Sequence, residues 1–343
     1  MSYFVFDLDE TLAEMYSVYY FIASLKLRET VATARPQRRA IAPVPRWLQT
    51  ELNRAYECFV ERVLEEETSA KPLGILRPGI LDIMTDIHVL PCEGAIKDVV
   101  IYSNNGHLES LHFIRDLIHR HLGRTDLIKD CIHWHHPMRD EERILIAGFP
   151  NKTWNVLRRI MTSAPCHAPS SLRPQDVHFF DDLEHSDLKR TLQGNYHQVP
   201  PYEFKASFTR LANIFRDCLV ESNVSQEAIK ELQDYVIQLF ATSEDTIFIS
   251  RDNELESIVH LFQEKTPGTA SSERQPPFWD RGVQQMRDVL VQLYERSESN
   301  HHKRTDKGNE RKVGKRKRSN RRSSRRHRRK RTRTRKRRGV NQS

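Results

Sequence analysis

Residues 3–11 read Tyr-Phe-Val-Phe-Asp-Leu-Asp-Glu-Thr, and this stretch decides how the rest of the chain is interpreted. Its apolar and aromatic first half is typical of a strand buried on both faces of a parallel sheet. Two carboxylates, Asp7 and Asp9, follow where that strand is expected to end. Because alternate side chains of an extended chain point the same way, both carboxylates are expected to face one site.

Two later stretches have the same form, an apolar run that ends in a polar side chain. Residues 98–103 end at Ser103, and residues 177–180 are followed by Asp181 and Asp182. Apolar residues recur at helical spacing between these runs, over residues 46–68, 107–122 and 152–163. Strands that alternate with helices predict an α/β protein with a doubly wound parallel sheet.

The carboxyl ends of parallel strands lie at one edge of a sheet, where ligands bind. We therefore expect one crevice to hold the polar side chains that follow the three strands, together with Lys152 at the start of a predicted helix. Phosphomonoester hydrolysis needs a nucleophile, a proton donor for the leaving alcohol and neutralisation of phosphate charge. Asp7 can attack phosphorus to form an aspartyl phosphate, and Asp9 can protonate the leaving oxygen and then activate water.

The remaining polar residues fit the other requirements of that reaction. Ser103 can donate a hydrogen bond to a phosphate oxygen, and Lys152 can offset negative charge as a point cation. Mg²⁺ takes oxygen ligands from one or two carboxylates plus phosphate, which Asp7 and the pair Asp181 and Asp182 can supply.

These motifs resemble those of the haloacid-dehalogenase (HAD) superfamily. The stretch FDLDETL at residues 6–12 is similar to its motif I, IYSNN at 101–105 to motif II, Lys152 to motif III and FFDD at 179–182 to motif IV. The DLDETL form, together with Leu-Arg-Pro-Gly at residues 76–79, resembles the FCP/SCP phosphatases, also called NLI-interacting-factor-like. Those enzymes remove phosphate from Ser and Thr of the RNA polymerase II C-terminal tail.

The resemblance implies a HAD-like fold over residues 1–205 and Mg²⁺-dependent hydrolysis of phosphoserine or phosphothreonine in a protein. It implies Asp7 as nucleophile, Asp9 as acid and base, and Ser103 and Lys152 as phosphate-binding residues. The implied metal ligands are Asp7, the backbone carbonyl of Asp9, and Asp181 or Asp182. The chain departs from the family in two respects. Motif IV usually reads Asp-Asn there, and residues 13–75 form a longer, more helical insertion here.

The rest of the chain divides by composition into two further parts. Residues 206–298 are expected to form a helical extension, because helical periodicity recurs at 206–221, 225–241 and 279–296. Residues 299–343 contain almost no apolar side chains and are expected to be disordered. A compact HAD phosphatase with a basic tail of this kind is also similar to proteins of large DNA viruses.

The charge of the chain is divided just as sharply. Residues 303–338 hold 22 Lys and Arg against Asp306 and Glu310, which leaves 33 bases and 44 acids in the remainder. The tail is therefore expected to bind nucleic acid or another polyanion without reading sequence, and it also fits a nuclear-localisation signal.

The sequence indicates an intracellular protein, cytoplasmic or nuclear. Its five cysteines include no Cys-x-x-Cys pair, which is typical of reduced thiols. No apolar run is long enough to span a bilayer, and no membrane partner is expected.

Several alternatives remain open on the sequence alone. The protein could be a nucleotide or polynucleotide phosphatase, or a catalytically inactive scaffold that binds nucleic acid.

Asn104 and Asn105 fit either a helix cap or the site lining, whereas Asp187 fits a helix cap better than a catalytic acid. The aromatic run at 16–21 favours core over substrate contact. The histidines at 133–136 lack partners at zinc-site spacing and favour a surface loop.

Overall fold

Five parallel strands form one sheet in the order β3-β2-β1-β4-β5. The strands are β1 (Ser2–Phe6), β2 (Ile96–Tyr102), β3 (Ile128–Ile132), β4 (Val177–Asp181) and β5 (Tyr196–Gln198). Every neighbouring pair is parallel, which confirms the expected α/β architecture with a parallel sheet. The chain runs outward from β1 through β2 and β3 on one side, and through β4 and β5 on the other. The strand order therefore reverses between β1 and β4, the point where such sheets bind ligands.

The computed structural model describes residues 2–27, 45–89, 96–139, 152–163, 168–240, 254–264 and 280–296. The basic tail, residues 265–277, Cys92 and Cys166 lie outside these residues. The chain divides into a unit that spans Met1–Val289 and a second that spans Leu290–Ser343, of which residues 290–296 are described.

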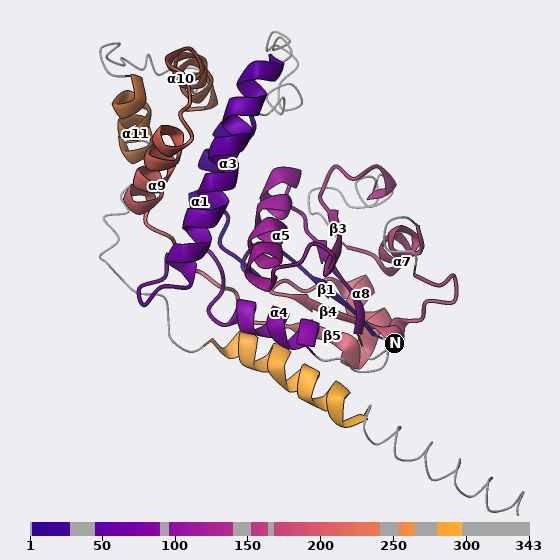
Figure 1. Ribbon diagram of the computed structural model, residues 1–343. Coiled ribbons are helices and arrows are strands. Elements are labelled where there is room, and N and C mark those ends of the chain that lie inside the picture. Colours follow the sequence, from indigo (N-terminus) through magenta and orange to yellow (C-terminus); the bar gives the residue numbers. More distant parts are fainter. Residues whose placement is uncertain are drawn as a thin grey trace, which may run out of the picture. The chain divides into compact units, whose positions relative to one another are not determined.

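The helices that accompany the sheet are α4 (Ile80–Val89), α5 (Leu108–Leu122), α7 (Trp154–Thr162) and α8 (Ser186–Leu192). Tyr3 and Val5 of β1 belong to a buried cluster that includes side chains of α7 and α8. Side chains alternate along a strand, so Phe4 and Phe6 point to the opposite face. Both faces of β1 are thus buried, which explains its continuous apolar run. Figure 1 shows the strands between α5 on one side and α7 on the other.

A group of helices packs together beside the sheet (Figure 1). It contains α1 (Tyr16–Lys26), α3 (Arg46–Glu67), α9 (Phe208–Glu221), α10 (Gln226–Phe240) and α11 (Glu254–Glu264). Phe21 of α1 is fully buried, and its ring lies 5.6 Å from that of Phe215 in α9 and 4.4 Å from that of Phe262 in α11. Apolar residues within the insertion at 13–75 therefore share a core with residues beyond 205.

Three 3-10 helices and one further helix complete the described elements. Three 3-10 helices, Pro137–Arg139, Pro174–Asp176 and Gln193–Asn195, lie in connections between the strands and helices. Residues 281–296 are also helical.

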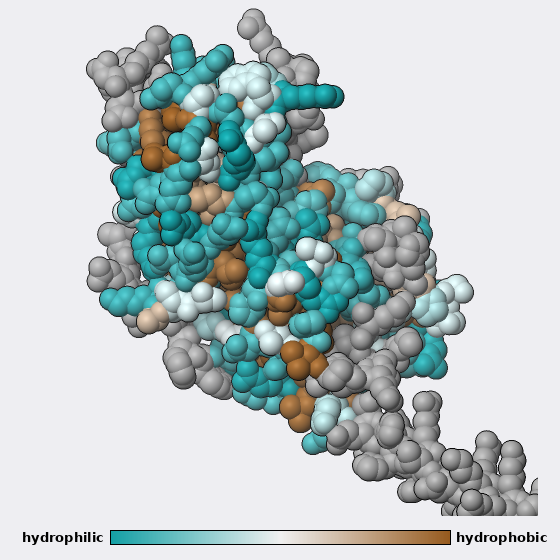
Figure 2. Space-filling view, viewed as in Figure 1, coloured by the Kyte–Doolittle hydropathy of each residue, from teal (hydrophilic) through white to brown (hydrophobic). Residues whose placement is uncertain are grey.

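Hydrophilic side chains dominate the face in Figure 2, where apolar residues form small separate patches. Within the described residues, no helix combines the length and apolar character needed to cross a bilayer.

Cys58, Cys131 and Cys218 are free, although the Sγ atoms of Cys58 and Cys218 lie 2.6 Å apart between α3 and α9.

Candidate active site

Asp7, Lys152 and Asp181 meet at the carboxyl edge of the sheet. Asp7 directly follows β1, where its backbone N–H donates to the carbonyl of Phe180 in the neighbouring strand. The Lys152 ammonium donates to Oδ1 of Asp7 at 2.5 Å and to Oδ2 of Asp181 at 2.7 Å. All three side chains are buried, with exposed fractions of 9% or less. One cation is therefore shared by two carboxylates from different strands.

Burial and mutual repulsion set the charge of this cluster. Burial, followed by the charge of Asp181, raises the pKa of Asp7, and Lys152 opposes that rise. The pKa of Asp181 is lowered: burial works against ionisation, but Lys152 and then His185 outweigh it. The two carboxylates raise the pKa of Lys152 despite its burial. Both pKa shifts favour the charged forms, so Lys152 is the cation and Asp181 the anion of the pair.

Asp182 adds a third carboxylate to the cluster. One carboxylate oxygen each of Asp7, Asp181 and Asp182 lies within 4.8 Å of the other two, and this is the only group of three or more potential metal-ligating residues in the described part of the chain. The hydroxyl of Thr11 donates to Oδ1 of Asp182 at 3.0 Å, and the backbone N–H of Asp182 donates back to that hydroxyl. Burial, then Asp7 and Asp181, raise the pKa of Asp182 to about 7.

Asp181 and Asp182 differ in how many hydrogen-bond partners they have in the protein. Asp181 accepts hydrogen bonds from Lys152 and from the backbone N–H of Leu183, and Nε2 of His185 lies 3.3 Å from its Oδ2. Among the described residues, only Thr11 donates a hydrogen bond from another side chain to the Asp182 carboxylate. The carboxylate of Asp182 therefore keeps more lone pairs available for a further ligand. The bonds of Asp181 instead fix the position of Lys152.

When all three carboxylates are ionised, the single ammonium leaves a net negative charge on the cluster. Hard divalent cations such as Mg²⁺ prefer carboxylate oxygens, so the donor set fits Mg²⁺. The histidines at 133, 135 and 136 are not part of this group.

Asp9 lies beside this cluster, held by the loop that follows β2. Nδ2 of Asn105 donates to both carboxylate oxygens of Asp9, at 3.1 and 3.3 Å, and Oγ of Ser103 donates at 3.5 Å. Burial, then the charge of Asp7, raise the pKa of Asp9 to about 7. A carboxyl group with this pKa can both give and take a proton near neutral pH.

The loop after β2 is itself fixed by hydrogen bonds. The backbone N–H of Ser103 donates to the carbonyl of Ile132, and its Oγ accepts from the N–H of Asn105 at 3.0 Å. Arg139 donates to the carbonyl of Ser103 and to Oδ1 of Asn104. Asn105 therefore both contacts the site and, through Oδ1, accepts from the backbone N–H of His107 just before α5.

Lys152 lies two residues before α7, which begins at Trp154. The sequence predicted a helix that begins at Lys152, whereas α7 begins two residues later. A hydrogen bond at the first residue of α7 accounts for this later start. Asp187, which the sequence favours as a helix cap, accepts at its Oδ2 from the backbone N–H of Trp154 at 2.9 Å, so the helix it caps is α7. Asp187 thus caps α7 from α8 and holds the segment that carries Lys152.

Arg77 holds the loop after Asp9 in place, a role that the sequence did not predict. Its buried guanidinium donates to the backbone carbonyls of Glu10 and Thr11 at 3.2 Å and to that of Pro200, and it pairs with Asp280 at 2.7 Å. These bonds tie the loop after Asp9 to distant parts of the chain. The Leu-Arg-Pro-Gly stretch was the available signal, but the carbonyl partners are not visible in a sequence.

The aromatic run at 16–21 divides between two environments. Phe21 is core, as expected, but Tyr16 is half exposed and lines a pocket that reaches Asp9. Tyr19 lies against His107, with ring centroids 4.1 Å apart.

Comparison of this chain with family models, curated proteins and solved structures found no match. The chemistry assigned to the site therefore rests on its residues and their geometry.

Proposed function

We propose that this protein is a Mg²⁺-dependent phosphomonoester hydrolase of the HAD type that works through an aspartyl phosphate on Asp7. The observation that carries the proposal is the Lys152 ammonium bridging Asp7 and Asp181, with Asp182 beside them, where the strand order reverses. A buried carboxylate beside a fixed cation, next to a second acid with a pKa near 7, suits phosphoryl transfer.

The proposed reaction has two steps, and the side chains of the chain supply its acid, base and nucleophile. A carboxylate oxygen of Asp7 bonds to phosphorus while the bond from phosphorus to the leaving oxygen breaks. Protonated Asp9 gives its proton to that oxygen, which departs as an alcohol. Ionised Asp9 then takes a proton from water, whose oxygen bonds to phosphorus and displaces Asp7. In this proposal Lys152 and Ser103 hold the phosphoryl oxygens.

Asp7 and Asp182 are the proposed side-chain ligands of Mg²⁺, because both carboxylate oxygens of Asp181 already accept hydrogen bonds, Oδ2 from Lys152 and Oδ1 from the backbone N–H of Leu183. When bound, Mg²⁺ supplies positive charge that offsets the phosphate oxygens.

The proposed substrate is a phosphoserine or phosphothreonine residue of a protein, as the FCP/SCP-like motifs imply. The basic tail favours a second candidate, a polynucleotide phosphatase whose substrate is brought by residues 303–338. A catalytically inactive nucleic-acid-binding scaffold is the alternative outside the enzymes, and the assay below separates it from both.

Release of a chromogenic alcohol from an aryl phosphate tests the proposal. Full-length protein should turn over this substrate with added Mg²⁺, and a chelator should abolish turnover reversibly. Asp7→Asn should fold normally and show no turnover, since an amide cannot form the phosphoenzyme. Wild-type protein without Mg²⁺-dependent turnover of any phosphomonoester would contradict the proposal.

A further inference from the structure

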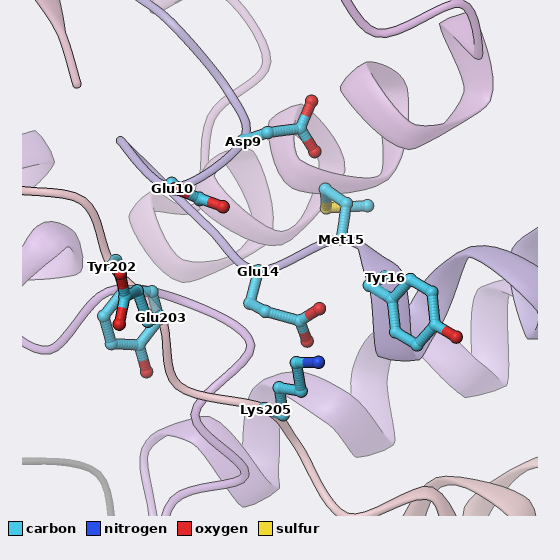
Figure 3. A pocket seen from close by; sticks show the side chains of 8 residues that line it. All are labelled: Asp9, Glu10, Glu14, Met15, Tyr16, Tyr202, Glu203 and Lys205. Atoms are coloured by element: carbon cyan, nitrogen blue, oxygen red, sulfur yellow. The ribbon is translucent and has the colours of Figure 1, made fainter. Parts of the chain in front are cut away.

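A pocket of about 480 Å³ opens beside Asp9 (Figure 3). Its walls come from the loop after β1, the start of α1 and the segment before α9: Asp9, Glu10, Glu14, Met15, Tyr16, Tyr202, Glu203 and Lys205. In Figure 3, Asp9 stands at one edge of the group, and Glu14 and Lys205 point toward each other on the far side from Asp9. The pocket is therefore continuous with the candidate acid of the reaction.

The position of Asp9 determines which part of a substrate would enter. Asp9 is the proposed donor to the leaving oxygen, so the alcohol part of the substrate must lie against Asp9. This pocket is lined in part by Asp9, so it can receive the groups attached to that alcohol. This step rests on the proposed function.

The ionisable side chains of the pocket are mostly acidic. The lining contains four acids and one basic side chain: Asp9, Glu10, Glu14, Glu203 and Lys205. Glu14 is buried, and its carboxylate accepts from the backbone N–H of Ser17 at 3.1 and 3.3 Å. Its negative charge therefore stabilises the N-terminus of α1. Glu10 and Glu203 are exposed and can meet a bound solute. A polyanion would meet repulsion here, and a cation would meet attraction.

The aromatic ring of Tyr16 is a second feature of the pocket that favours a cation. Tyr16 is half exposed, and the Lys205 ammonium lies 5.3 Å from the centre of its ring. This face of the pocket thus already accommodates a cation next to an aromatic ring, an arrangement that also suits a guanidinium. Met15 and Tyr202 supply buried apolar surface for an aliphatic stem.

We propose that this pocket selects substrates with a cationic side chain next to the phosphorylated residue. The preferred substrate is then a phosphoserine or phosphothreonine peptide flanked by Arg or Lys, in preference to an acidic phosphopeptide or a nucleotide. Glu10 and Glu203 are the specificity-determining residues, and Lys205 competes with the incoming cation.

The test measures kcat/KM of the full-length protein, with Mg²⁺, for two phosphoserine peptides that differ only in Arg or Glu flanking residues. Wild type should prefer the Arg peptide. Glu10→Gln with Glu203→Gln should lower this preference about three- to thirty-fold, the range for two partly exposed charge pairs. Lys205→Gln should raise it. The ratio between peptides cancels any general change in rate, and an aryl phosphate serves as the reference substrate.

A matched control removes the same charge elsewhere. Glu227→Gln with Glu231→Gln alters two exposed acids of α10 and should leave the peptide preference unchanged. Turnover of the aryl phosphate with no preference for the Arg peptide, or with equal effects of both double variants, would overturn this inference and leave the phosphatase function standing. Absence of aryl phosphate turnover would overturn both.

Discussion

The ammonium of Lys152 lies 2.5 Å from Oδ1 of Asp7, although 145 residues separate them in the chain. The same nitrogen lies 2.7 Å from Asp181, which follows a different strand. Burial of Lys152 would be costly without these two partners, and burial of either acid would be costly without Lys152. The contact therefore links the stability of the fold to the charge of the proposed nucleophile.

Replacing Lys152 tests this link. Lys152→Met leaves Asp7 and Asp181 without their cation, so the free energy of unfolding at pH 7.5 should fall by about 3–5 kcal/mol without Mg²⁺. The loss should be smaller at pH 5, because protonation of the carboxylates removes their repulsion. Denaturant titrations at both pH values measure it. Lys189→Met, at an exposed surface pair, is the control and should be nearly neutral. Equal stability of Lys152→Met and wild type would contradict this account.

Asp9 should give the reaction a pH dependence that varies with the leaving group. Its pKa is raised to about 7, so it keeps its proton in mildly acidic solution and loses it as the pH rises through 7. Turnover of a phosphoserine peptide should fall above about pH 7, because an alkoxide needs that proton to leave. Asp9→Asn should lower peptide turnover by about 10²–10⁴-fold and aryl phosphate turnover much less. Equal losses on both substrates would give Asp9 a structural role instead.

Asp181 and Asp182 should respond differently to amide substitution. Asp182→Asn keeps an oxygen to accept from Thr11 but removes a charge from the proposed metal site. The half-saturating Mg²⁺ concentration should rise by about ten- to a hundred-fold. Asp181→Asn should lower turnover with a smaller change in Mg²⁺ requirement, because it acts on Lys152. Mg²⁺ titrations of turnover and of thermal stability distinguish the two, and the reverse pattern would make Asp181 the metal ligand.

Removal of residues 299–343 should separate catalysis from nucleic-acid binding. The tail adds almost no apolar surface, so thermal stability should stay nearly unchanged and aryl phosphate turnover should persist. Binding to duplex DNA should be lost, because the remaining residues carry more acids than bases. Binding by the full chain should fall steeply with added salt and ignore sequence. A truncated protein that binds as tightly as the whole would place the nucleic-acid site elsewhere.

The sequence predicted the central strands well and the outer ones poorly. The strands β1, β2 and β4 are apolar runs because they are buried in the middle of the sheet. In contrast, β3 lies at one edge and carries the half-buried Lys129 and Asp130, which interrupt any apolar run. The other edge strand, β5, is only three residues long. Neither gave a strand signal, so the sequence missed both edges.

The candidate site divides in a similar way. Residues such as Asp7 and Lys152 could be selected because their chemistry and spacing are local properties of the chain. Arg77 and Asp187 act on backbone groups far away in sequence, and only the fold shows which groups those are.

The most direct test of the account is the location of the phosphoryl group during turnover. Full-length protein is mixed with an aryl phosphate and Mg²⁺, quenched in acid within the first turnovers, and digested for peptide mass spectrometry. The account predicts one phosphoryl group on Asp7 in wild type and none in Asp7→Asn, which should also release no alcohol. Sustained hydrolysis by wild type with Asp7 unmodified, or normal turnover by a folded Asp7→Asn protein, would contradict it.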